Sequence, residues 1–205
     1  YEHGTAATAL GGYTSVIDKP LQNEPCMTNA ETFDFKENKV SPNAYVDYCF
    51  WGGLTSYNFG DLKDLDEKGC VSFKSFIGPV SPDYESLSYG QALEAMDIIK
   101  EFDGRAGFHC EDYSIIKNQE KRMKEAGRND WKAYLESRPV VAEIVATDAI
   151  IEIAKATGCK AHICHVSHPA VAKKIKAAQD EGYDITAETC THYLTFTDED
   201  VIKNG

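Results

Sequence analysis

Residues 71–110 read VSFKSFIGPVSPDYESLSYGQALEAMDIIKEFDGRAGFHC and contain the pattern that decides the fold. Residues 71–77 are rich in aromatic and β-branched side chains and stop at a Gly-Pro pair, which predicts a strand. Residues 88–102 place apolar side chains at helical spacing after Ser88, a residue type favoured at helix N-caps. Residues 105–110 form a second predicted strand. A strand, a helix and a strand in this order form a βαβ unit, whose two strands run parallel.

The same alternation extends along the chain in both directions. The predicted strands are residues 11–18, 45–51, 71–77, 105–110, 160–166 and 183–190. One predicted helical segment begins at Asn29, and a separate short one ends at Gly69. Further helical segments are predicted at 88–102, 114–158 (with a break at Arg138-Pro139) and 168–180. Six such strands fit either an open doubly wound sheet or a (β/α)8 barrel. The Gly-rich phosphate turn that is typical of the open sheet does not follow the first strand, and a barrel would need about two more units.

The composition is that of an ordinary globular protein, with 42% hydrophobic and 26% charged residues. Lys and Arg number 21 against 33 Asp and Glu, so the net charge is −12. This charge repels phosphate backbones and anionic membrane surfaces, and we therefore expect neither nucleic acid nor a membrane as a partner. The seven cysteines contain no C-x2-C pair, and we expect reduced thiols in a cytoplasmic protein.

Polar side chains recur where the predicted strands end. They are Asp18, Lys74, His109 with Glu111 and Asp112, His165 with His168, and Glu188 with His192. In parallel α/β architectures the carboxyl ends of the strands meet at one edge, and the loops there carry the chemistry. We therefore expect the functional site at this edge.

The residues alone leave the individual roles open. Lys74 shares a strand face with Ser72 and Phe76, and it is either a lysine that reaches water or a buried functional amine. His109 is either a hydrogen-bonded core histidine or a metal ligand. Strand alternation predicts that His162 and His165 lie on opposite faces, so that they cannot bind one ion together, and His165 is the better ligand candidate.

Seven short motifs in order along the chain carry a resemblance to a known family. They are Gly4-Thr5-Ala6-Ala7 with Gly11-Gly12-Tyr13-Thr14, Phe50-Trp51-Gly52-Gly53, Phe73-Lys74-Ser75-Phe76, His109-Cys110-Glu111, Ser137-Arg138-Pro139, Cys164-His165-Val166-Ser167 and Glu188-Thr189-Cys190-Thr191-His192-Tyr193-Leu194. The chain resembles the cyclic amidohydrolases, which include hydantoinases, dihydropyrimidinases, dihydroorotases and allantoinases. The Phe-Trp-Gly-Gly motif and His192 are most similar to the allantoinase branch.

The resemblance implies a (β/α)8 barrel that holds two divalent metal ions, usually Zn2+. By match to the motifs, a carboxylated Lys74 bridges the two ions, and His109 and His165 ligate one of them. His192 is expected near the substrate. The implied substrate is a small cyclic ureide and the implied assembly is a homo-oligomer, a tetramer in this family. Lys19 departs from the family pattern, which usually has Met there.

The implied reaction is the opening of allantoin to allantoate, within purine catabolism. A hydantoinase, dihydropyrimidinase or dihydroorotase of the same mechanism is the close alternative, and a metal-free, non-catalytic homologue is the second. The family's H-x-H ligand pair is expected upstream of Tyr1, and its general-base aspartate beyond Gly205. Residues 1–205 are therefore expected to form the central part of the domain, an incomplete barrel of about six βα units that lacks the first and last strands. A helical insertion is expected at about 114–158. Residues 1–205 are expected to contain no catalytic residue and to be inactive by themselves.

Overall fold

Six parallel strands form one curved sheet in the computed structural model, which describes residues 1–21, 23–80 and 84–204. The strands are β1 (Ser15–Asp18), β2 (Asp47–Gly53), β3 (Ser72–Ile77), β4 (Arg105–Cys110), β5 (Lys160–Ile163) and β6 (Ile185–Ala187). Each strand pairs with the next along the chain, in the order β1-β2-β3-β4-β5-β6. A doubly wound sheet reverses its strand order partway, whereas a barrel does not. The chain therefore forms a half-barrel, and the prediction of an incomplete barrel is confirmed.

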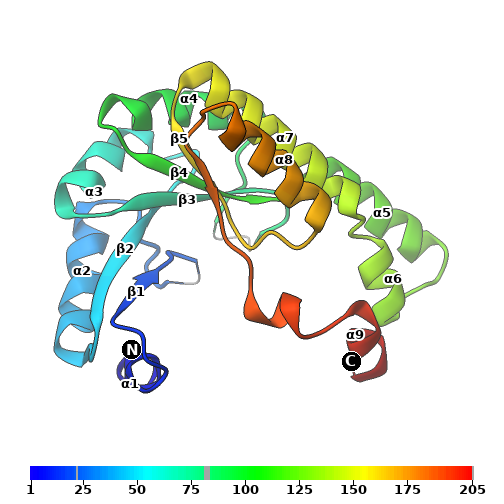
Figure 1. The fold of residues 1–205 in the computed structure, drawn as a ribbon, viewed down its shortest axis with the longest axis horizontal. Coiled ribbons are helices and arrows are strands. Elements are labelled where there is room, and N and C mark those ends of the chain that lie inside the picture. The colour runs from blue at the N-terminus through cyan, green and yellow to red at the C-terminus, as the bar shows by residue number, and fades with distance from the viewer. Residues whose placement is uncertain (22, 81–83, 205) are drawn as a thin grey trace.

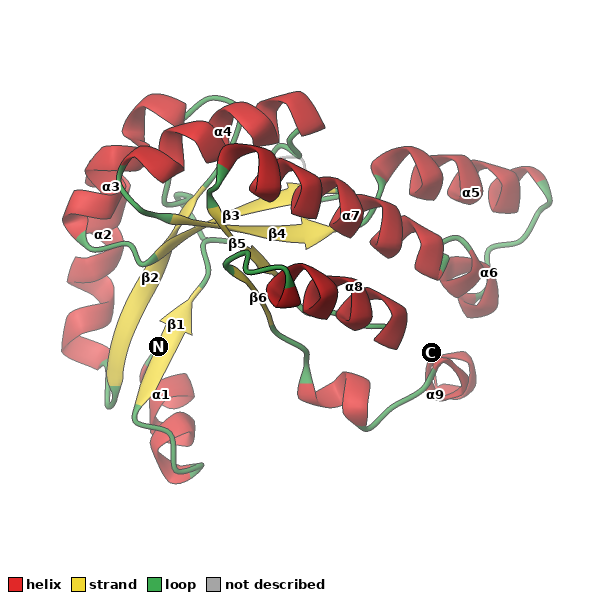
Figure 2. Cartoon of the chain, turned by 45° about the horizontal axis from the view of Figure 1, so that its top comes forward, coloured by secondary structure: helices red, strands yellow, loops and turns green. Residues whose placement is uncertain are grey.

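Helices cover the outer face of this sheet (Figures 1 and 2). The helices of the described residues are α1 (Glu2–Leu10), α2 (Ala30–Val40), α3 (Leu62–Lys68), α4 (Tyr89–Glu101), α5 (Tyr113–Glu125), α6 (Trp131–Glu136), α7 (Val140–Thr157), α8 (Pro169–Asp180) and α9 (Asp198–Asn204). Of these, α2, α3, α4, α7 and α8 form the outer layer. The predicted boundaries at Asn29 and Ser88 are confirmed, because each side chain caps its helix by accepting a backbone hydrogen bond. Gly69 ends α3 with a left-handed φ of 109°. No helix among the described residues is long and apolar enough to cross a membrane.

Two helices, α1 and α9, are absent from the sequence prediction. Only Thr5 of α1 is buried, and no described residue of α9 is buried. Neither helix therefore shows the apolar stripe by which amphipathic helices are recognised. Gly205, after which the sequence predicts the general-base aspartate, lies outside the described residues.

The segment predicted as a helical insertion contains α5, α6 and α7. Pro139 is the N-cap of α7, which agrees with the predicted break. Helix α7 connects β4 to β5 and packs against both strands and against α4. Helices α5 and α6 instead extend away from the sheet (Figure 2). Helix α7 is therefore part of the helical layer of the barrel. That the segment of about 114–158 is an insertion remains a prediction.

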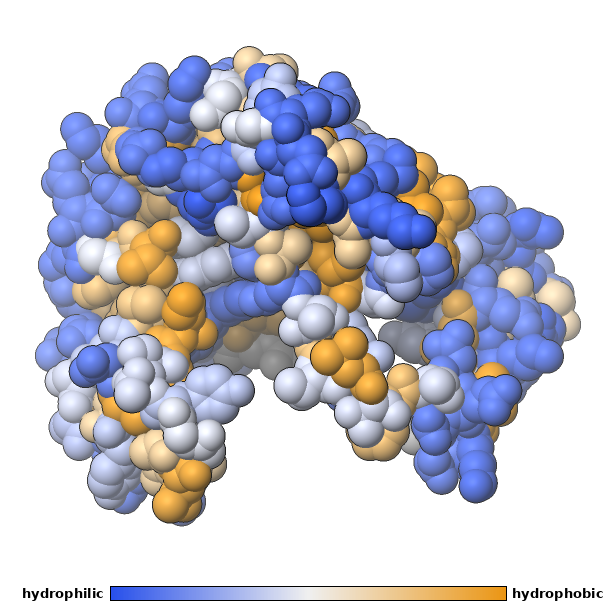
Figure 3. Space-filling view, in the orientation of Figure 1, coloured by the Kyte–Doolittle hydropathy of each residue, from blue (hydrophilic) through white to orange (hydrophobic). Residues whose placement is uncertain are grey.

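The hydrophobic core lies between the convex face of the sheet and the helices. Phe73, Phe108 and Ile163 point outward from β3, β4 and β5 into this core, where they join side chains such as Met96 and Ile150. The alternate residues of the same strands point to the concave side, which is hollowed between the segments that carry the two termini (Figure 3). The curved sheet thus separates an apolar outer layer from a polar inner face.

The inner face contains one large apolar side chain whose position depends on a glycine. A Cβ atom added to Gly107 would lie 2.3 Å from an atom of the Trp51 ring, far inside van der Waals contact. The Trp51 side chain therefore covers the backbone of β4 only because residue 107 has no side chain.

We expect Gly107→Ala to lower the free energy of unfolding by about 1–3 kcal/mol, since Trp51 is buried and has to move. Gly60→Ala is the matched control, because a Cβ atom at that position meets nothing within 4 Å. Urea unfolding of both variants measures the difference. Equal unfolding midpoints for Gly107→Ala and the unmodified protein would show that the ring does not need this space.

Candidate functional site

Lys74 is buried on the inner face of β3, with 3% of its surface exposed. Its Nζ donates a hydrogen bond to the Ser75 carbonyl at 3.1 Å and lies 4.3 Å from the centre of the Phe76 ring. Burial lowers the pKa of the Lys74 amine, because a charge is poorly solvated there. Of the two sequence-based interpretations, a lysine that reaches water is therefore wrong, and a buried amine is the one that the structure shows.

His109 and His165 meet at the carboxyl end of the sheet. Nδ1 of His109 lies 3.2 Å from Nε2 of His165, and Nε2 of His109 lies 3.2 Å from Oε2 of Glu111. Two imidazole nitrogens on one tetrahedral Zn2+ are about 3.3 Å apart, given Zn–N distances of about 2.0–2.1 Å. The facing nitrogens therefore fit a shared cation, and Glu111 is placed to orient the His109 ring, as partners behind metal-binding histidines commonly do.

The backbone at His165 explains how it reaches His109. Strand β5 ends at Ile163, and His165 has a positive φ of 37°, which is uncommon outside glycine. This turn ends the strand before the predicted residue 166, and strand alternation no longer applies to His165. Its side chain joins the inner face, where burial and the charge of Lys74 lower its pKa to about 4. At neutral pH His165 is therefore an uncharged imidazole, which is the form that binds metals.

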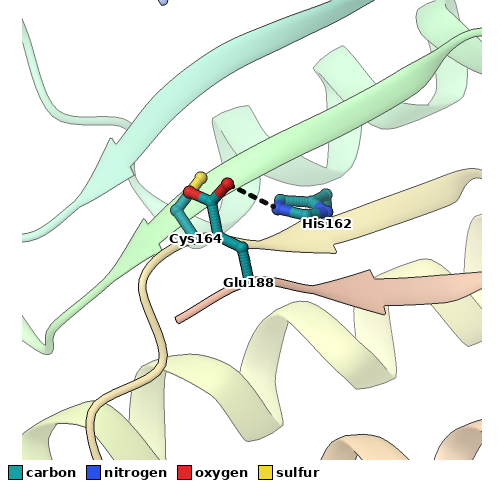
Figure 4. Close-up of side chains that lie close together, drawn as sticks. All are labelled: His162, Cys164 and Glu188. Atoms are coloured by element: carbon teal, nitrogen blue, oxygen red, sulfur yellow. Dashed lines mark ion pairs between the residues drawn. The ribbon is translucent and has the colours of Figure 1, made fainter. Parts of the chain in front are cut away.

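A second group of polar side chains lies beside these residues, and we call Lys19, His162, Cys164 and Glu188 the Glu188 cluster. Nε2 of His162 lies 3.6 Å from Oε2 of Glu188, while Lys19 forms an ion pair with Oε1 of the same carboxylate (Figure 4 draws the other three members). Lys19 follows β1 and Glu188 follows β6, so this ion pair joins the two edges of the half-barrel. Lys19 also lies 5.0 Å from the Trp51 ring centre.

Sequence reasoning placed Glu188 at the sheet edge but assigned no function to Cys164 or His162. The available signal was the period of two along β5, which puts His162 and Cys164 on the same inner face. That Glu188 and Lys19 meet them depends on the curvature of the sheet, which the sequence pattern does not give.

The remaining strand-end residues serve local structure. Asp18 pairs with Lys36 at 2.8 Å, Asp112 caps α5 by accepting from the Ile115 backbone at 3.0 Å, and His168 caps α8. His192 is exposed in a short 3-10 helix (Thr191–Leu194), with its ring 4.5 Å from that of Tyr193. The structure brings together Lys74, His109 and His165, and it records no contact between His192 and any of them among the described residues. The substrate-proximal role of His192 remains a prediction.

Fold and site together define a parallel α/β half-barrel whose concave, carboxyl-end face holds a buried lysine and a pair of facing histidines. Comparison with known proteins shows what the chain as a whole is similar to. No family model matches the chain. The allantoinase of Rubrobacter xylanophilus is 35% identical over 206 residues, which cover 100% of this chain and 45% of that protein. The allantoinase of Salmonella paratyphi B is 35% identical over 199 residues, covering 95% of this chain and 44% of that protein.

Solved structures of a hydantoinase and a dihydropyrimidinase match the fold of this chain. The L-hydantoinase (dihydropyrimidinase) of Arthrobacter aurescens matches with a TM-score of 0.94 and 30% identity, covering 98% of this chain and 44% of that one. The dihydropyrimidinase of Brevibacillus agri, at 23% identity and a TM-score of 0.85, shows the same fold. The chain is thus a homologue of the allantoinases along its whole length, and it spans less than half the length of these relatives. The resemblance to the cyclic amidohydrolases is confirmed.

The Glu188 cluster predicts a pH dependence of stability. The facing imidazole of His162 and the ammonium of Lys19 lower the pKa of Glu188 from 4.5 to about 2, against the opposite effect of burial. A depressed folded-state pKa stabilises the protein above the unfolded-state value, and this stability is lost as the pH falls towards the folded-state value. We expect the free energy of unfolding to fall between about pH 5 and pH 2, and to fall less in Glu188→Gln.

Denaturant unfolding at several pH values measures this effect. Glu67→Gln is the matched control, because Glu67 is exposed and its ion pair with Lys63, at 3.9 Å, is a surface pair. If Glu188→Gln and Glu67→Gln show the same dependence on pH as the unmodified protein, the cluster does not stabilise the fold in this way.

Proposed function

We propose that the full-length protein is a metal-dependent cyclic amidohydrolase that opens allantoin to allantoate. The observation that carries this proposal is the meeting of Lys74, His109 and His165 on one inner face, in a chain that is 35% identical over its length to named allantoinases. A hydantoinase or dihydropyrimidinase reaction is the second candidate, and the structural match to the Arthrobacter aurescens enzyme favours it.

We further propose that Lys74, His109 and His165 hold two divalent ions, most simply Zn2+. Bound divalent ions supply Lewis-acid polarisation of a carbonyl and lower the pKa of water. His109 and His165 would bind through the nitrogens that now face each other. Glu111 keeps the His109 ring in place through the other nitrogen.

Lys74 would contribute as a carboxylated side chain. Its buried amine has a lowered pKa, which increases the fraction of the uncharged form. The lone pair of the uncharged amine would form a bond to the carbon of carbon dioxide, one N–H proton would be released, and an anionic carbamate would result. Two dications beside it would stabilise that negative charge. A cytoplasmic homotetramer acting in purine catabolism completes the proposal.

The substrate is tested by measuring the turnover of allantoin, hydantoin and dihydrouracil by the full-length protein. We expect the highest kcat/KM with allantoin. Turnover of hydantoin or dihydrouracil without turnover of allantoin would favour the hydantoinase or dihydropyrimidinase reaction. Turnover of none of the three, with fewer than one metal ion bound per chain, would support a non-catalytic homologue.

Lys74→Ala in the full-length protein tests the bridging role. We expect kcat/KM to fall by more than about 100-fold, since the loss of groups behind metal ligands already costs about 10–100-fold. Added short carboxylic acids should restore part of the activity, because a free carboxylate occupies the space of the lost carbamate.

Lys63→Ala is the control, because Lys63 is exposed and lies on α3 outside the inner face. An active Lys74→Ala protein, or an inactive one that no carboxylate rescues, would count against the carboxylated lysine.

A further inference from the structure

We propose that His162, Cys164 and Glu188 form a binding site for a thiophilic divalent cation such as Zn2+, separate from the facing pair His109 and His165. The three ligand atoms all lie within 4.8 Å of one another (Figure 4). None of its three residues is used in the proposed hydrolase function, although Cys164 adjoins Lys74 and forms a side-chain hydrogen bond with it.

The sheet brings the three residues together. His162 lies on β5, and Cys164 continues the strand by one residue, with its backbone N–H donating to the Phe108 carbonyl at 3.0 Å. Alternation places both side chains on the inner face. The backbone N–H of Glu188 donates to the Ile163 carbonyl at 3.1 Å, which holds Glu188 beside this pair. All three positions are therefore fixed by backbone hydrogen bonds between neighbouring strands.

The set of ligand atoms suits zinc. It offers an imidazole nitrogen, a thiol sulfur and a carboxylate oxygen, which are the three ligand types that Zn2+ takes in proteins. Ligand atoms on a tetrahedral Zn2+ are about 3.3–3.8 Å apart, and Nε2 of His162 already lies 3.6 Å from Oε2 of Glu188. The Cys164 thiol becomes a thiolate on coordination, so one thiolate and one carboxylate face the two positive charges of the ion, while the carboxylate also pairs with Lys19.

The His162 ring is oriented for such a role. Its Nδ1 lies 2.7 Å from the Thr186 hydroxyl, which fixes the ring, whereas Nε2 is buried and faces Oε2 of Glu188 at 3.6 Å, beyond the distance of an ordinary hydrogen bond. Only 13% of the side-chain surface is exposed. Metal-binding histidines typically hold one nitrogen by a hydrogen bond in this way and bind the ion with the other.

Lys19 supports the site without blocking it. Its ammonium pairs with Oε1 of Glu188, and the oxygen that faces His162 is Oε2. A cation on Oε2 can therefore bind while the ion pair stays in place. Lys19 thus holds the Glu188 carboxylate in place, as Thr186 holds the His162 ring, and it also places a second positive charge beside the ion.

The test is a titration of the metal-free, reduced full-length protein with Co2+, followed by absorption. A cobalt–thiolate bond gives an ultraviolet charge-transfer band that imidazole and carboxylate ligands lack. We expect this band in the unmodified protein and in His109→Ala, because His109 belongs to the other group of residues. Cys164→Ser should remove the band, and Glu188→Gln and His162→Ala should weaken Co2+ binding at the band at least tenfold.

Cys70→Ser is the matched control, because Cys70 is a buried free thiol packed in the outer core. Circular dichroism of each variant checks that it is folded, and the near-isosteric Glu188→Gln keeps the test decisive if His162→Ala does not fold. A protein without a thiolate band, or a band that survives Cys164→Ser, would overturn the proposal. A band lost in His109→Ala but kept in Glu188→Gln would also overturn it, because the ion would then belong to the other group. If the unmodified protein shows the band but does not hydrolyse cyclic ureides, the result would count against the proposed hydrolase function and not against this metal site.

Discussion

The structure depends on the period of two along its parallel strands. Each strand sends one side chain outward to the helices and the next one inward, so the outer face can be apolar while the inner face is polar. Phe73 and Lys74 show the constraint most directly, because these neighbours on β3 lie in the hydrophobic core and on the inner face respectively. A slip of one residue would exchange the two faces and place an ammonium group in the core.

The concave face places charged groups in surroundings with little water, and this changes their chemistry. Burial lowers the pKa values of Lys74 and His165, while hydrogen bonding to His162 and the ammonium of Lys19 lower the pKa of Glu188. The first two groups are shifted towards their uncharged forms, which are nucleophilic and able to bind metals, whereas Glu188 is held as an anion. One face therefore contains neutral ligands beside a fixed negative charge, which is an arrangement suited to cations.

The relatives give this arrangement its context. The chain matches allantoinases along its length while covering 45% of the Rubrobacter xylanophilus protein and 44% of the Salmonella paratyphi B protein, and it superposes on a hydantoinase with a TM-score of 0.94. The half-barrel thus corresponds to less than half of a longer chain in those proteins. In this chain the ion pair between Lys19 and Glu188 joins the ends of β1 and β6, and it connects the two edges of the half-barrel directly.

The sequence by itself determined the six strands, most of the helices that connect them, and the edge at which the polar residues gather. These features are local, because they follow from hydrophobic periodicity, caps and turn residues within a few positions. It also indicated Lys74, His109 and His165 through short motifs. Only the tertiary structure decided that Lys74 is buried, that the positive φ of His165 turns its ring to His109, and that Lys19 reaches Glu188. His109 and His165 are 56 positions apart in the sequence, and Lys19 and Glu188 are 169 apart. Both contacts exist because the sheet curves. Curvature is a property of all six strands together, so no single stretch of sequence contains it.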